Sequence, residues 1–137
     1  MRIEEIRKGN IVLFKGFPFE VKGFFSREGK DGEEVSFIMV RSVRGSWEEK
    51  CRIHETEGMD ISEAFLKANG FVVPNKAMPE VWARPLGGYR YLRYHAGVKS
   101  LDFETTNCIQ RVPWAVRKVH QMQNACTDYG LEIGFGV

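Results

Sequence analysis

The sequence predicts an α+β protein, in which a small N-terminal β-barrel packs on a mainly antiparallel C-terminal sheet with two helices. Short apolar runs separated by turn-forming residues fill residues 1–53, as expected for several short strands. Two segments, about 61–69 and 113–128, place apolar residues at helical spacing. Strands and helices do not alternate regularly along the chain, so a parallel sheet is not expected. We therefore divide the chain into a barrel over 1–53 and an α+β subdomain over 54–137.

The barrel prediction rests on strands at 11–14, about 19–24, 35–40 and 47–53. The polar, glycine-bearing segment 26–33 is expected to be an exposed loop. Short strands in so small a segment cannot form a flat stable sheet, and closing them into a barrel leaves fewer open edges.

The opening segment 6–21 (IRKGNIVLFKGFPFEV) combines basic residues, a Lys-Gly turn, an apolar strand, a Gly-x-Pro turn and a second apolar strand. This pattern resembles the first hairpin of SH3-like barrels, such as the N-terminal domain of translation elongation factor P. The resemblance implies an SH3-like barrel, and it does not imply a role in translation.

The helix at about 61–69 has start and stop signals. Asp60 and Glu63 have the spacing of a capping box, and Gly70 suits the left-handed position that ends a helix. Its apolar face is expected to include Ile61 and Phe65.

The second half is expected to hold strands within about 80–112, with a hairpin turn at Gly87-Gly88. Pro113 suits the first turn of a helix over about 113–128, and residues 131–135 alternate like a final strand. Met122 and Cys126 are expected to face the core.

Three segments, 60–71 (DISEAFLKANGF), 119–125 (VHQMQNA) and 129–133 (YGLEI), occur in this order. Together they resemble a family of small uncharacterised proteins from Bacteroidales genomes, prophages and phages. The resemblance implies the fold and a phage or mobile-element origin, and it implies no activity. The longer loop at 26–33 and the residues 115–118 depart from the family pattern.

Composition is that of an ordinary globular protein, with 43% hydrophobic and 28% charged residues and a net charge of +2 over 137 residues. An odd number of cysteines, 3, argues against a secreted disulfide framework. The charged N-terminus lacks the apolar core of a signal peptide, and no apolar run is long enough to span a membrane. We expect a cytoplasmic protein, in the host cell if it is phage-encoded, with virion association left open.

A basic, tyrosine-rich stretch is the first candidate binding site. Residues 84–118 carry 7 Lys or Arg against 2 Asp or Glu. Aromatic rings stack on bases and arginine contacts phosphate, so this strand could serve as a platform for nucleic acid or a nucleotide. An exposed tyrosine-rich strand without a ligand is the alternative. The residues named for the site are Tyr89, Arg90, Tyr91, Arg93 and His95.

The second candidate is a polar strip on the last helix, formed by His120, Gln123 and Asn124. Amides and an imidazole on one helix face can bind a base edge or a peptide backbone. The favoured alternative is that His120 and Gln123 satisfy backbone groups inside the fold.

No catalytic signature is present. A zinc site would have one local ligand pair, Cys51 and His54, where structural sites usually have two. A thiol nucleophile at Cys108 or Cys126 lacks a recognisable base. The sequence therefore predicts neither an enzyme, nor a metal, nor a cofactor.

The resulting prediction is a non-enzymatic module that binds a host or phage protein, in one version a host defence factor. The alternative is an accessory protein that binds nucleic acid or a nucleotide through residues 84–118. No membrane association is expected.

Overall fold

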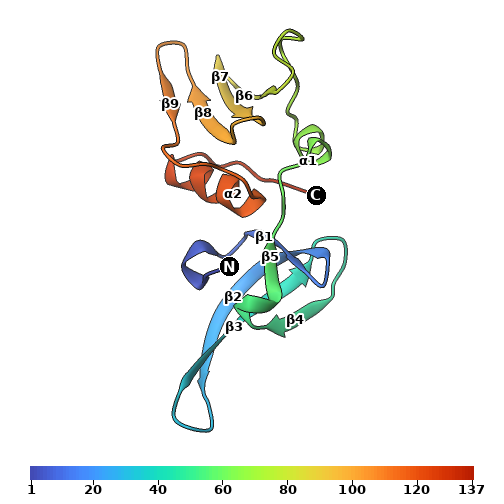
Figure 1. The fold of residues 1–137 in the computed structure, drawn as a ribbon, viewed down its shortest axis with the longest axis vertical. Coiled ribbons are helices and arrows are strands. Elements are labelled where there is room, and N and C mark those ends of the chain that lie inside the picture. The colour runs from blue at the N-terminus through green and yellow to red at the C-terminus, as the bar shows by residue number, and fades with distance from the viewer. The chain divides into compact units, whose positions relative to one another are not determined.

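The computed structural model describes residues 1–137, which divide into two compact units (Figure 1). Unit 1 comprises Met1–Asp60 and Lys118–Asn124, and unit 2 comprises Ile61–Arg117 and Ala125–Val137. The last helix, α2 (Val119–Asp128), therefore gives its first half to unit 1 and its second half to unit 2. Two antiparallel sheets and two α-helices confirm the α+β class.

Unit 1 contains an antiparallel sheet with the strand order β4-β3-β2-β1-β5. Its elements in chain order are the 3₁₀ turn η1 (Ile3–Glu5), β1 (Ile11–Phe14), β2 (Phe17–Glu28), β3 (Glu34–Ser42), β4 (Glu48–Cys51), the 3₁₀ turn η2 (Ile53–Glu55) and β5 (Thr56–Gly58).

The sheet of unit 1 is open. Strands β4 and β5 lie at its two edges and do not pair with each other, so the structure shows an open sheet where the sequence predicted a closed barrel. The sequence also gave no sign of β5, which pairs with β1 from Phe14↔Thr56 to Val12↔Gly58. Because β5 belongs to this sheet, unit 1 extends to Asp60, beyond the predicted boundary at residue 53.

The β2–β3 hairpin is longer than its sequence suggests. Polar residues at 26–28, predicted as loop, continue β2 and pair with β3 as far as Glu28↔Glu34. The register shifts between Val21 and Gly23, which marks a bulge where a strand bends. Both strands form the long two-stranded arm drawn in blue and teal in Figure 1.

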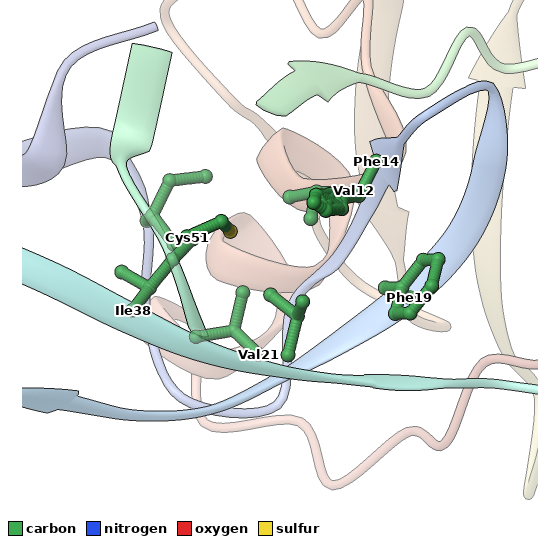
Figure 2. Close-up of a cluster of buried hydrophobic side chains, with 8 residues drawn as sticks. Val12, Phe14, Phe19, Val21, Ile38 and Cys51 are labelled. Carbon is green, nitrogen blue, oxygen red and sulfur yellow. The ribbon is translucent and has the colours of Figure 1, made fainter. Parts of the chain in front are cut away.

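A compact apolar core fills unit 1. Alternate residues of β1, β2 and β3 supply it, because successive side chains of a strand point to opposite faces. Figure 2 shows Val12, Phe14, Phe19, Val21, Ile38 and Cys51, which are almost entirely removed from solvent. The rings of Phe14 and Phe19 meet edge to face, with centroids 5.4 Å apart.

Unit 2 contains a second antiparallel sheet, with the order β6-β7-β8-β9. Its elements are α1 (Glu63–Ala68), β6 (Val81–Gly87), β7 (Arg90–His95), β8 (Ser100–Glu104) and β9 (Ile109–Arg111). The turn between β6 and β7 contains Gly87 and Gly88 at positive φ, which confirms the predicted hairpin turn.

Helix α1 is shorter than predicted and has a different cap. The Ser62 hydroxyl, and not Asp60, accepts the hydrogen bond from the Phe65 backbone N–H, at 3.1 Å. Gly70 ends the helix at φ +81°, as predicted. The buried face consists of Phe65, Leu66 and Asn69, so the predicted apolar face was displaced around the helix.

The residues before α2 are not helical. The backbone N–H groups of Val112 and Val116 donate to the carbonyls of Leu101 and Lys99, and Pro113 lies between them without an N–H. These bonds hold the segment in an extended path, and α2 begins only at Val119. Within it, Met122 and Cys126 are buried, as predicted.

The expected strand at 131–135 is absent. This segment is fixed instead by the Asn69 side chain, whose amide bonds both the N–H and the carbonyl of Gly136, and by stacking of Phe135 on Phe65 with ring centroids 5.9 Å apart. None of the helices has the length and apolar character needed to cross a membrane.

Candidate functional site

The structure divides the predicted site residues between the two units. Those of the tyrosine-rich strand lie in unit 2, while His120, Gln123 and Asn124 lie in unit 1.

In unit 2, Tyr91, Arg93 and His95 share the outer face of the sheet, because they alternate along β7 with the buried Leu92 and Tyr94. Tyr89 lies in the preceding turn at φ +63° and is 80% exposed. Arg90 bends back to donate to the carbonyls of Gly87 and Leu86, at 3.3 and 3.1 Å. The alternation of exposed and buried side chains predicted from the sequence is therefore correct for β7. Tyr89 lies in the turn before β7 and is not part of this alternation.

A buried carboxylate organises this outer face. Asp102 on β8 lies between Arg93 on β7 and Arg111 on β9, and its side chain is only 3% exposed. Arg111 donates from Nε to Asp102 Oδ1 at 3.0 Å. His95 Nε2 lies 3.2 Å from Asp102 Oδ2, within ion-pair distance although not aligned for a hydrogen bond. Sequence analysis did not single out Asp102.

Arg93 is also paired with a carboxylate, because it donates to Glu104 at 3.3 Å. The Arg84 guanidinium lies 5.6 Å from the centroid of the Phe135 ring, a contact that leaves its charge in place. The charges of Arg93 and Arg111, which carboxylates compensate, attract phosphate weakly. Binding of nucleic acid by residues 84–118 stays a prediction, and these contacts do not favour it.

In unit 1, Gln123 and Asn124 of α2 hold the N-terminal segment. Gln123 accepts from the Ile11 N–H at 2.8 Å and donates to the Gly9 carbonyl at 3.1 Å. Asn124 donates to the Glu5 carbonyl at 3.0 Å and accepts from the Asn10 side chain at 2.8 Å. These amides satisfy backbone and side-chain groups inside the fold, which is the structural alternative given above for Gln123.

His120, in contrast, satisfies no backbone group inside the fold. Its side chain is buried in unit 1, the residue being 3% exposed, and neither ring nitrogen has a hydrogen-bond partner. Burial lowers the pKa of His120 below its ordinary value; Glu5 opposes this effect, whereas Lys118 and the N-terminal ammonium add to it. A Cβ atom on Gly58 would lie 3.0 Å from His120 Cε1, so the ring packs closely against the glycine of β5.

Two of the three thiols are poor nucleophiles. Burial raises the pKa of Cys51 to about 11 and that of Cys126 to about 12, so both are protonated at neutral pH. Cys108 is exposed, and all three thiols are free. No cluster of three or more His, Cys, Asp or Glu side chains is placed to hold a metal ion.

Sequence analysis missed an aromatic surface at one end of the unit 1 sheet. Phe17, at the start of β2, is 64% exposed, and Trp47, before β4, is 51% exposed. The indole meets the buried Phe19 ring edge to face at 5.6 Å. Lys15 Nζ lies 5.6 Å from the centroid of the Trp47 ring and 3.1 Å from Glu49 Oε1. We call Lys15, Phe17 and Trp47 the aromatic end. The missed signal was a Trp directly after the predicted Gly45-Ser46 turn.

Comparisons with protein-family models, with curated proteins and with solved structures found no match to this chain. The geometry of the chain itself therefore carries the functional argument.

Proposed function

We propose that the chain is a non-enzymatic module that binds a protein partner through the aromatic end of unit 1. The observation that carries the proposal is the half-exposed Trp47, which is held against Phe19 and Lys15 rather than left free to rotate. Tryptophan is enriched among the few residues that dominate binding energy, and a side chain already ordered loses little entropy on binding.

Phe17 extends the same surface. It lies two residues before Phe19 on β2, and both are on the same side of the strand. Two large exposed apolar side chains with a lysine beside them match the common composition of an interface, an aromatic centre with a polar rim.

An SH3-like barrel, left open between its edge strands β4 and β5, is part of the proposal. What supports it is the 12-residue β2, which pairs with β1 near its start and with β3 from Phe19 onward, and which is bulged between Val21 and Gly23. A bulge bends a strand, as a small barrel requires.

The resemblance to Bacteroidales phage and prophage proteins supports a mobile-element origin and a cytoplasmic setting. The partner would then be a host or phage protein, and a host defence factor is one candidate.

The test is affinity capture from a lysate of the native host by three forms of the full chain. A partner that binds the aromatic end should be enriched by the wild type and lost with Phe17→Ser/Trp47→Ser. It should be retained by Tyr89→Ser, which removes a still more exposed aromatic side chain from unit 2. A protein retained equally by all three forms, or no enrichment at any salt concentration, would contradict the proposal.

A further inference from the structure

A second surface of unit 1 combines stacked phenyl rings with cations. Phe25 on β2 and Phe37 on β3 are directly paired across the strands, and their rings stack with centroids 5.4 Å apart at an interplanar angle of 11°. Arg27 and Arg52 lie over the Phe37 ring, at 4.9 and 5.6 Å from its centroid, and Lys50 lies 5.1 Å from the centroid of Phe25. We call these five residues the cation–phenyl face.

The register of the sheet places Phe25, Arg27, Phe37 and Lys50 on one side, and Arg52, which follows β4, reaches the same side over the Phe37 ring. Phe25 and Arg27 are two residues apart on β2, and Lys50 pairs with Met39, two residues from Phe37. The opposite side of the same strands carries the buried Ile38 and Cys51. The cation–phenyl face is therefore the outer side of the sheet, with its three cations exposed.

The positive charge of this face is not compensated. None of Arg27, Lys50 and Arg52 forms an ion pair, whereas two neighbouring carboxylates do: Glu20 with Lys22 at 3.1 Å and Glu48 with Arg41 at 3.8 Å. Three further carboxylates, Glu28, Glu34 and Glu55, lie near the face.

Glu28, Glu34 and Glu55 form no ion pair with the three cations. Glu28 and Glu34 pair with each other in register at the end of the hairpin, and strand alternation directs both to the side away from Arg27. Glu55 accepts a hydrogen bond from the Arg52 backbone N–H at 2.8 Å.

We propose that the cation–phenyl face binds single-stranded nucleic acid. Flat guanidinium groups and phenyl rings offer stacking surfaces to unpaired bases, and the three cations offer contacts to phosphates. A duplex hides its base faces and would gain only the phosphate contacts. No side chain of the face other than its cations can hydrogen-bond a base, so we expect little preference among bases.

This proposal is independent of protein binding at the aromatic end. It uses the outer side of β2, β3 and β4, and it shares no residue with Lys15, Phe17 and Trp47. Either proposal can fail while the other stands.

The test is fluorescence anisotropy of the full chain with a short labelled oligothymidylate, as the single strand alone and annealed to its complement. Three phosphate contacts on a single strand give a slope of log affinity against log salt of about −2. Affinity should therefore fall roughly 15-fold to 20-fold between about 50 and 200 mM salt. The duplex should bind more weakly than the single strand.

Four variants assign binding to the face. Phe37→Leu should weaken binding about tenfold through lost stacking. Lys50→Gln should make the salt slope shallower by about 0.7. The matched controls are Phe24→Leu, an exposed phenyl ring on the opposite side of β2, and Arg44→Gln, an exposed cation in the β3–β4 turn; both should bind like the wild type.

The outcomes decide the proposal. Equal affinity for single strand and duplex, binding that ignores salt, or no binding at the lowest salt would overturn it. So would an equal loss in Arg44→Gln and Lys50→Gln, because the contact would then be general attraction to a cationic surface. Lys50 is exposed, so its variant stays informative even if Phe37→Leu loses stability.

Discussion

Both units place arginine and aromatic side chains on the outer face of an antiparallel sheet, and only one of them neutralises the charge. In unit 2, Asp102 and Glu104 of β8 lie beside Arg111 and Arg93. In unit 1, the cations over Phe25 and Phe37 have no carboxylate partner. The conspicuous basic stretch therefore has carboxylate partners for Arg93 and Arg111, whereas the three cations of the inconspicuous face have none.

The difference teaches that a run of basic residues says little about charge until the neighbouring strand is known. Asp102 lies opposite Arg93 and Arg111 only because β7, β8 and β9 pair in one particular register. A shift of one residue would turn Asp102 to the other side of the sheet.

The largest expected effect tests whether the two units can fold independently of each other. Met122 is fully buried in the half of α2 that belongs to unit 1, and Met122→Asp would bury a carboxylate without a partner. That costs several kcal/mol against a total stability of ~5–15 kcal/mol, so the variant should be unfolded at room temperature.

Because α2 contributes to both units, circular dichroism should show the loss of both sheets in Met122→Asp. A variant that retains unit 2 signals in NMR spectra would show that the units fold independently. Gln121→Ala, one residue away and half-buried, should keep the cooperative melt of the wild type.

A smaller effect is expected where α2 holds the N-terminal segment. Gln123→Ala leaves the Ile11 N–H and the Gly9 carbonyl without their partner, which should cost about 2 kcal/mol at roughly 1 kcal/mol for each hydrogen bond. Urea denaturation measures the loss. Gln123→Glu, which keeps one acceptor oxygen for Ile11, should recover part of it, and an unchanged midpoint in Gln123→Ala would show that these bonds are dispensable.

The buried imidazole makes the stability of unit 1 depend on pH. Burial lowers the pKa of His120 in the folded chain below the unfolded value of about 6.5, so the unfolded state takes up a proton first as pH falls. The stability is complete above about pH 6.5 and should fall below it, by at most about 1.4 kcal/mol per pH unit until the folded pKa is reached.

His120→Leu fills the same space without a titrating group, and it should remove this part of the pH dependence while remaining folded at pH 7. Denaturation midpoints of both proteins between about pH 7.5 and pH 5 measure the difference. Parallel curves for the two proteins would show that His120 titrates normally, or that Glu5 stabilises its charged form enough to offset burial.

The smallest expected effect sharpens the comparison of the two faces directly. Asp102→Asn/Glu104→Gln removes the carboxylates that compensate Arg93 and Arg111, and it should give unit 2 the character proposed for unit 1. Each freed arginine should steepen the salt dependence of oligonucleotide binding by about 0.7. Because Asp102 is buried, the fold of the double variant is checked by circular dichroism before binding is measured. No gain in binding would show that charge compensation does not distinguish the faces.

Much of the fold could be predicted because the signals were local. The positive φ of Gly70 and Gly88 and the buried side of α2 at Met122 follow from neighbouring residues alone. The misses have long-range causes. Thr56 joins the first sheet by pairing with Phe14, which lies 42 residues earlier in the chain. Nothing in the sequence of residues 54–58 indicates a strand.

The site was harder to predict than the fold. Sequence reasoning identified the polar character of Gln123 and Asn124 but could not identify their partners, which lie more than 100 residues earlier, with separations of 112 for Ile11 and 119 for Glu5. His120 was expected to share that role, and it has no hydrogen-bond partner because its ring is enclosed beside Gly58.

The division of α2 between two units also fixes the order in which the chain can fold as it is synthesised. The whole sheet of unit 1, Met1–Asp60, leaves the ribosome long before Lys118–Asn124, the helical segment that completes the unit. Until then the N–H of Ile11 and the carbonyl of Gly9 lack their Gln123 partner, and Val119 cannot donate to the Met59 carbonyl. Unit 1 must therefore wait for residues 118–124, and contacts of such separation slow folding. An emerging chain that stalls before residue 118 would hold an unfinished sheet, which is the state most exposed to aggregation and to chaperones.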